Sequence, residues 1–143
     1  MRMFDKHGVP KSRIELLRKV SMFEDLPHKV LARIDSHCDE IEVHPGRTLT
    51  RQGDDSHEAF IVAAGNAEVR VGDEVVRQTE VGEMIGDIGV LEKRHRTATV
   101  TAVTDMRLLV LNGRDLDWLF QDKRLAARVK ENLERHLAGP QPS

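Results

Sequence analysis

GEMIGDIGVLEKRHRTATV, residues 82–100, is the stretch of this chain that decides its fold. Gly86 permits a sharp turn at which backbone N–H groups can approach an anion closely. A helical turn after it would direct its N-terminal dipole at the same point. Arg96 adds a planar, permanently charged fork suited to phosphate. The stretch therefore predicts a site for a small phosphate ester, with an apolar surround formed by Met84, Ile85, Ile88, Val90 and Leu91.

The composition restricts the class of protein. A chain of 143 residues suits one domain, and a net charge of −2 does not provide the basic stripe of a nucleic-acid binder. With four Phe, one Trp and no Tyr, stacking platforms for single strands are not expected. Cys38 is the one cysteine, which excludes an intrachain disulfide and favours a reducing compartment. Because no signal peptide or membrane span is evident, we expect a cytoplasmic protein that binds neither nucleic acid nor membrane.

Two short helices are expected near the N-terminus. Ser12 and Glu15 form a capping box, which predicts a helix that runs to about Val20. Pro27 suits the first turn of a second helix. Apolar residues at helical spacing predict the buried face of that second helix: Val30, Leu31, Ile34 and Cys38.

From Ile41 the hydrophobic period changes to two, which is typical of strands. Residues 59–64 form an unbroken apolar run that suits a buried strand, and residues 98–103 and 107–111 predict two more. Gly65-Asn66 and Gly72-Asp73 are both two-residue hairpin signals. Short strands separated by glycine turns indicate an antiparallel sandwich or barrel.

A C-terminal helix is expected to close the chain. Asn112 suits a helix N-cap, and a long stripe with helical spacing follows: Leu125, Ala126, Val129, Leu133 and Leu137. We expect the first half of this stripe to pack on its own chain. The second half would stay available to a second copy or to an effector protein. The expected organisation is a tail and short helix over 1–21, one domain over 22–138 and a disordered tail over 139–143.

This order of elements, together with two motifs, resembles the cyclic nucleotide-binding domain. That domain is the sensor of cAMP-receptor transcription factors, protein kinase A regulatory subunits and cyclic-nucleotide-gated channels. The resemblance runs from about Leu26 to Leu137. It is carried by glycines 46, 53, 65, 82 and 86, by IGDIGVL at 85–91 and by RTATV at 96–100. It implies an eight-stranded antiparallel β-roll, or double-stranded jelly roll, with flanking N- and C-terminal helices.

The resemblance also implies roles for individual residues. Arg96 would pair with the cyclic phosphate, the backbone N–H groups after Gly86 would cradle its oxygens, and Thr97 would donate to phosphate or base. Asp87 would accept from the ribose 2′-hydroxyl and stabilise Arg96. His136 could contact a purine from the final helix, although a solvated last turn is the alternative. The implied ligand site comprises Met84, Ile85, Gly86, Asp87, Ile88, Gly89, Arg96, Thr97, Ala98 and His136.

Asp87 departs from the family, which has glutamate at this position. The side chain is shorter by one methylene, about 1.5 Å of reach. The sugar could sit closer, a water could fill the gap, or the hydrogen bond could be lost. A lost bond to a charged acceptor would cost about 1.5–3 kcal/mol.

Two functions therefore remain open. One is a stand-alone sensor of cAMP, or of cGMP, without a DNA-binding or catalytic domain. The other is a degenerate domain that binds no nucleotide and serves as an interaction or dimerisation module. No enzyme is expected, because the serines lie outside any nucleophile elbow and no Walker A motif is present. His44, His57 and His95 lack the spacing of metal ligands, so no metal is expected.

Overall fold

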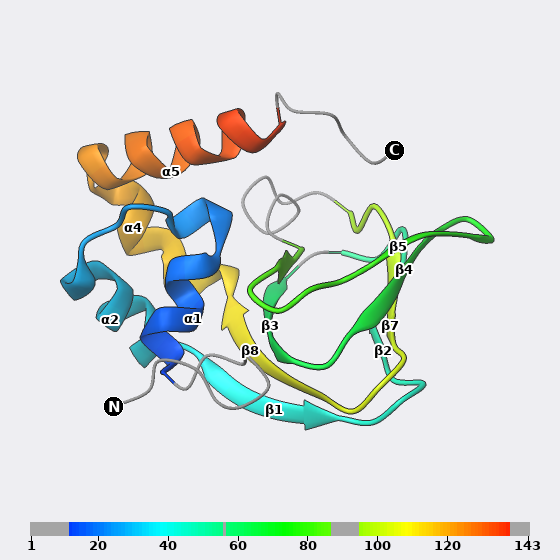
Figure 1. Ribbon diagram of the computed structural model, residues 1–143. Helices are drawn as coiled ribbons and strands as arrows, with labels where there is room; N and C mark the ends of the chain where they lie inside the picture. Colours follow the sequence, from blue (N-terminus) through cyan, green and yellow to red (C-terminus); the bar gives the residue numbers. More distant parts are fainter. Residues whose placement is uncertain (1–11, 56, 87–94, 138–143) are drawn as a thin grey trace.

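The computed structural model places the helices on one side and the strands on the other (Figure 1). It describes residues 12–55, 57–86 and 95–137. The strands are β1 (Asp39–Val43), β2 (Thr48–Thr50), β3 (Glu58–Ala64), β4 (Ala67–Val71), β5 (Glu74–Gln78), β6 (Met84–Ile85), β7 (Thr99–Ala102) and β8 (Met106–Asn112). They form two four-stranded antiparallel sheets, in the orders β1-β8-β3-β6 and β2-β7-β4-β5. The predicted β-roll with flanking helices is confirmed.

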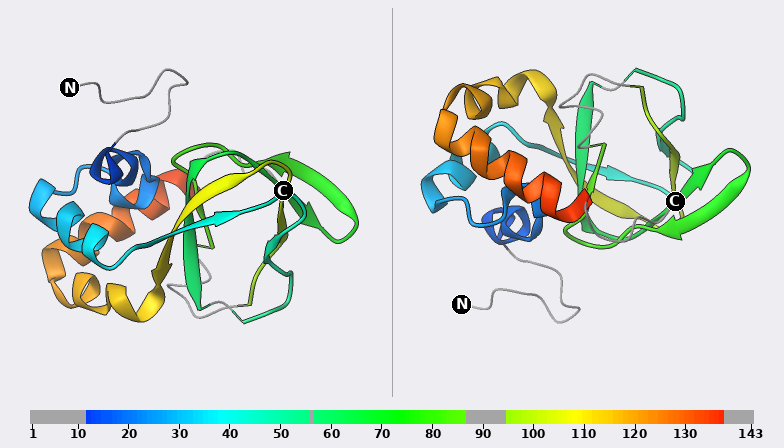
Figure 2. Two further views of the ribbon diagram at one scale, coloured as in Figure 1. Left: turned by 90° about the horizontal axis from the view of Figure 1, so that it is seen from below. Right: turned by 90° about the horizontal axis from the view of Figure 1, so that it is seen from above.

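Gly65 does not turn a hairpin, contrary to the prediction. β3 pairs with β6 and β8, whereas β4 pairs with β5 and β7, so the chain changes sheets at Gly65-Asn66. Gly65 has a φ of +81°, and a Cβ there would overlap the carbonyl oxygen of Asp105. The glycine therefore allows a close crossing of two chain segments. The second predicted hairpin, at Gly72-Asp73, does join the paired strands β4 and β5. This hairpin projects from the roll on the side away from the helices (Figure 2).

The helices begin where capping residues predict. α1 (Arg13–Lys19) has Ser12 as its N-cap, and the Ser12 hydroxyl accepts from the backbone N–H of Glu15 at 3.3 Å. α2 (His28–Ser36) follows Pro27, and Asn112 caps the 3₁₀ turn η2 (Gly113–Leu116). The remaining helices are α4 (Asp117–Gln121) and α5 (Lys123–Leu137). Residues 21–23 form a 3₁₀ turn η1 (Ser21–Phe23) that buries Met22 and Phe23.

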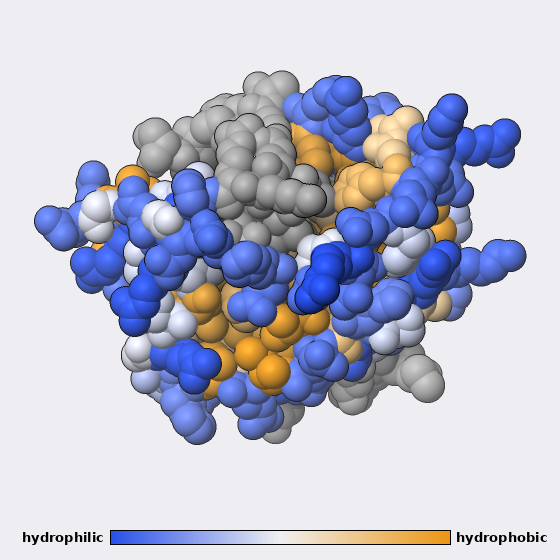
Figure 3. Space-filling model, turned by 180° about the vertical axis from the view of Figure 1, so that it is seen from behind, coloured by the Kyte–Doolittle hydropathy of each residue, from blue (hydrophilic) through white to orange (hydrophobic). Residues whose placement is uncertain are grey.

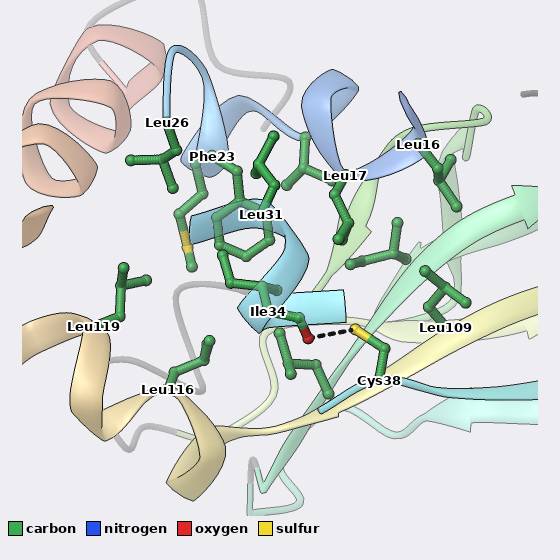
Figure 4. Packing of buried hydrophobic residues seen from close by; sticks show 14 of the residues in the cluster. Leu16, Leu17, Phe23, Leu26, Leu31, Ile34, Cys38, Leu109, Leu116 and Leu119 are labelled. Atoms are coloured by element: carbon green, nitrogen blue, oxygen red, sulfur yellow. Dashed lines mark hydrogen bonds between the residues drawn. The ribbon is translucent and has the colours of Figure 1, made fainter. Parts of the chain in front are cut away.

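Two apolar clusters hold the chain together. One joins the helices to the outer side of β3 and β8, and it contains Leu31 and Ile34 from α2 and Cys38, two residues after the end of this helix (Figure 4). The second fills the roll and contains Phe60, Val100 and Leu108. The predicted apolar face of α2 is thus confirmed.

The larger apolar residues of α5 among the described side chains pack on their own chain. Val129 is fully buried in the helical cluster, and Leu125 and Leu133 pack against it half-buried. In the second half of the stripe, Leu133 is half-buried on its own chain because α5 lies along η1 and α4, and the side chain of Leu137 lies outside the described residues.

Candidate functional site

Gly86 lies at the end of β6, the short strand that β3 holds through the pairs Phe60–Ile85 and Ile61–Met84. Its φ is +90°, a region that costs an L-residue energy. A Cβ at this position would overlap Nη1 of Arg96 and would lie 3.3 Å from the carbonyl oxygen of Glu58. Glycine is therefore required both for the turn and for the close approach of the guanidinium.

Arg96 is positioned by a loop that precedes β3. Its backbone N–H donates to the carbonyl oxygen of Asp54 at 2.7 Å, and its own carbonyl accepts from Gly53 at 2.9 Å. The preceding residue, His95, forms an isolated β-bridge with Asp55. The His95 Nδ1 and Asp55 Oδ1 atoms are 3.0 Å apart. The loop thus fixes the point at which the Arg96 side chain leaves the backbone.

The Arg96 side chain runs inward, and the residue is only 9% exposed. Nη2 donates to the carbonyl oxygen of Glu58 at 2.6 Å. Nη1 is buried and has no hydrogen-bond partner among the described residues. A buried donor on a charged group is costly to leave unpaired. The geometry therefore suits an anion that reaches Nη1.

Burial and nearby charges have opposite effects on the pKa of Arg96. Burial lowers the pKa of Arg96, and the nearby carboxylates of Glu58 and Asp54 act against that change. A guanidinium keeps its charge throughout the physiological range even when its pKa falls. Arg96 is thus a permanent cation in a poorly hydrated position.

A cavity of about 190 Å³ lies beside Arg96. Its lining comes from β2 and the residue after it, from the 54–55 loop, from the start of β3 and from Arg96, with one apolar member: Thr48, Leu49, Thr50, Arg51, Asp54, Asp55, Glu58 and Arg96. Thr50 donates its hydroxyl to the carbonyl oxygen of Ala98 at 3.0 Å, which ties β2 to the segment that follows Arg96. The cavity is smaller than sites that enclose a whole drug-sized ligand. It could hold one polar part of such a molecule.

The structure brings Gly86 and Arg96 together, but it places the other described site residues differently. Met84 packs against the helical cluster, and Ile85 is buried in the cluster inside the roll. Thr97 is exposed, whereas Ala98 is half-buried and packs against the roll cluster. None of these four lines the cavity beside Arg96.

The remaining candidates lie outside the described residues. They are Asp87, Ile88 and Gly89, and the apolar positions Val90 and Leu91 lie in the same undescribed range. His136 belongs to α5, but its side chain is also outside what the structure describes.

Sequence reasoning missed the contribution of Asp54 and Glu58. Glu58 supplies a carbonyl oxygen to Arg96, and Asp54 pairs with the Arg96 backbone. Their signal in the sequence is an acidic loop, Gly53-Asp54-Asp55, directly before a buried strand. That pattern alone does not reveal that the loop crosses residues 95–96, because the two segments are about 40 positions apart.

Comparison with protein families decides the identity of this fold. The model of the cyclic nucleotide-binding domain matches residues 40–123, which is more than half of the chain and includes Gly86 and Arg96. The chain belongs to the cyclic nucleotide-binding domain family. A cAMP-dependent protein kinase regulatory subunit of Mycosarcoma maydis is 32% identical over 129 residues, which are 85% of this chain and 24% of that protein. A cGMP-dependent protein kinase of Plasmodium berghei is 32% identical over 83 residues, which are 58% of this chain and 10% of that protein.

Solved structures agree with this cyclic nucleotide-binding fold. The N-terminal domain of a transcriptional regulator from Streptomyces coelicolor has a TM-score of 0.75 and 26% identity, and the match covers 85% of this chain and 91% of that one. The regulatory domain of Toxoplasma gondii PKA, solved with cAMP, has a TM-score of 0.71 at 21% identity, with coverage of 90% and 58%. The chain spans about a third or less of the length of the first curated relatives. Within the described ranges, no helix has the length and apolar character needed to cross a bilayer.

Proposed function

We propose that this domain binds a cyclic nucleotide, cAMP in the first instance, and acts as a regulatory sensor without catalytic activity. The single observation that carries the proposal is the buried Arg96 guanidinium, whose Nη1 has no partner among the described residues and lies against Gly86. A phosphate oxygen at that position would satisfy Nη1 and offset the cost of burying the charge.

The residues that would contact the rest of the nucleotide are assigned by resemblance to the family. Backbone N–H groups of residues 86–89 would bind the phosphate oxygens, and Asp87 would accept from the ribose 2′-hydroxyl. Thr97 and His136 would approach phosphate or base. The relatives named above include both a cAMP-dependent and a cGMP-dependent kinase protein, so both ligands belong in the test.

The test is calorimetric titration of the whole chain with cAMP, cGMP and 5′-AMP. The wild type should bind a cyclic nucleotide, and Arg96→Ala should bind it at least about 100-fold more weakly, because a hydrogen bond to a charged group and a buried ion pair are lost together. Arg47→Ala is the matched control, since Arg47 is exposed and lies outside the cavity lining.

The control should bind like the wild type, and thermal unfolding should show that both variants are folded. Equal affinity of wild type and Arg96→Ala would refute this site. If no cyclic nucleotide binds to the wild type, the proposed function is wrong, and the alternative of an interaction module with the same fold is favoured.

A further inference from the structure

The cavity beside Arg96 is lined by more carboxylates than a phosphate site requires. Asp54, Asp55 and Glu58 all line it, against the guanidinium groups of Arg51 and Arg96. His95 lies next to these groups and contacts the Asp55 carboxylate at 3.0 Å. The lining thus has three carboxylates against two guanidinium groups, a net negative charge, although the buried Arg96 belongs to it.

Arg96 itself marks the place where a ligand would meet these carboxylates. It is nine-tenths buried, its Nη1 has no partner among the described residues, and it lines the same cavity. Both Glu58 and Asp54 contact Arg96 through their backbones: the Glu58 carbonyl oxygen accepts from Nη2 at 2.6 Å, and the Asp54 carbonyl oxygen accepts from the Arg96 backbone N–H at 2.7 Å. The carboxylates of Glu58 and Asp54 also both act on the Arg96 charge. A phosphate bound to Arg96 would therefore feel both of them.

We propose that the Glu58 and Asp54 carboxylates make this site a charge filter, which accepts a singly charged phosphodiester and disfavours a doubly charged phosphomonoester. The proposal rests on the function proposed above. A cyclic phosphate is a diester with one negative charge. The second pKa of a phosphomonoester is about 6, so 5′-AMP carries close to two negative charges at pH 7.5.

The physical basis is repulsion that scales with ligand charge. Each carboxylate repels a dianion twice as strongly as a monoanion at the same distance, and each guanidinium attracts it twice as strongly. Because the lining holds three carboxylates and two guanidinium groups, the second charge of a dianion adds net repulsion. Low hydration around the buried guanidinium weakens screening by salt. The filter is thus independent of the shape of the ribose–phosphate ring.

The experiment measures dissociation constants for three probes at pH 7.5: cAMP, 5′-AMP and the methyl ester of 5′-AMP. The methyl ester has one charge and no ring, so it separates charge from shape. Titrations use the wild type, Glu58→Gln, Asp54→Asn and the control Glu42→Gln. Glu42 is an exposed residue of β1, and its change removes the same charge from the chain at a site outside the cavity lining.

A charge filter predicts that the wild type binds the methyl ester more tightly than 5′-AMP. It also predicts that Glu58→Gln and Asp54→Asn each lower the ratio of the 5′-AMP to the cAMP dissociation constant by about threefold to tenfold. Glu42→Gln should leave that ratio unchanged. Two substituted residues keep the test valid if one variant unfolds.

An unchanged ratio in folded Glu58→Gln or Asp54→Asn would overturn the filter and leave cyclic nucleotide binding intact. The same holds if the methyl ester binds as weakly as 5′-AMP, since ring shape would then decide. If the wild type binds no cyclic nucleotide, the proposed function and the filter both fail.

Discussion

At the scale of single residues, the candidate site depends on one contact, between Gly86 and the Arg96 guanidinium. The glycine supplies no side chain, and the arginine occupies the space where a Cβ would lie. This explains why these two residue types are needed together at positions ten apart in the sequence. The same contact predicts how a substitution at Gly86 differs from one at a glycine that has similar backbone strain but no steric overlap.

Gly86→Ala should destabilise the fold more than Gly46→Ala. Both glycines have φ near +90°, at +90° and +93°, so both changes cost about 1–2 kcal/mol of backbone energy. A Cβ at position 46 meets no atom within 4 Å, whereas at position 86 it overlaps Nη1 of Arg96. Urea denaturation should show the larger loss for Gly86→Ala, and only that variant should lose nucleotide affinity. Equal losses would mean that the guanidinium moves aside freely.

Cys38 provides a second prediction at this scale, for the pH dependence of stability. Burial raises the pKa of Cys38 to about 12, nearby Asp35 and Asp39 add to that rise, and Arg13 opposes it. The thiol stays protonated in the folded chain, where it donates to the Ile34 carbonyl oxygen at 3.4 Å (Figure 4). The unfolded chain, with an ordinary thiol pKa near 8.5, loses this proton first.

The folded state therefore binds more protons than the unfolded state between about pH 8.5 and 12, and stability falls as the pH rises through this range. The slope should approach about 1.4 kcal/mol per pH unit. Denaturation of the wild type and of Cys38→Ala between pH 8 and 10.5 isolates the effect, because other groups titrate alike in both. Parallel pH profiles of the two proteins would contradict it.

At the scale of elements, a buried amide helps to hold α5 on the segment of η1. Asn132 is fully buried, and its Nδ2 donates to the carbonyl oxygens of Met22 at 3.3 Å and Glu24 at 2.8 Å. Its Oδ1 accepts from Nη2 of Arg135 at 2.8 Å. The side chain thus joins segments that lie about 110 residues apart. Helical periodicity shows only that position 132 adjoins the apolar stripe, so the sequence does not reveal this role.

Asn132→Ala should lower the free energy of unfolding by about 2–3 kcal/mol, because two carbonyl groups lose their donor in a buried place. Glu131→Ala, at an exposed neighbouring position on the same helix, should change stability by less than about 0.5 kcal/mol. Chemical denaturation of both variants checks the difference. A small effect of Asn132→Ala would show that water replaces the lost donor.

At the scale of the whole molecule, α5 is part of the folded core. It covers the helical cluster through Val129 and is tied to η1 by Asn132. Large hydrophobic residues that remain exposed among the described part of the chain are few: Val71, Val75, Val103 and Phe120. On the face seen in Figure 3 the surface is mainly hydrophilic, with hydrophobic residues in small areas separated by polar ones. A partner that meets the described side chains of α5 would therefore contact mainly its polar face.

A chain that ends at Lys123 should consequently lose about 4–6 kcal/mol of stability, from the burial of Val129 and the hydrogen bonds of Asn132. Circular dichroism should show a lower melting temperature or an unfolded chain. A truncated chain that melts like the full one would mean that α5 packs only loosely on the helices.

The sequence by itself determined the class of fold and many of its elements, and it singled out Gly86 and Arg96 as residues of the candidate site. Ser12 and Asn112 mark helix starts, because a capping side chain acts on its own neighbours, and an unbroken apolar run marks the buried strand β3. Gly86 and Arg96 are evident from their residue types, since only glycine adopts such a turn easily and only arginine carries a fixed planar charge.

Only the tertiary structure decided what lies against these residues. That Gly65 crosses between sheets, that Glu58 and Asp54 surround Arg96, and that Asn132 fastens α5 all depend on segments distant in sequence. Local patterns record the preferences of a segment and its near neighbours. Contacts of this kind form only when burial of the two apolar clusters brings remote segments together. For that reason the carboxylates near Arg96 could not be predicted from the sequence.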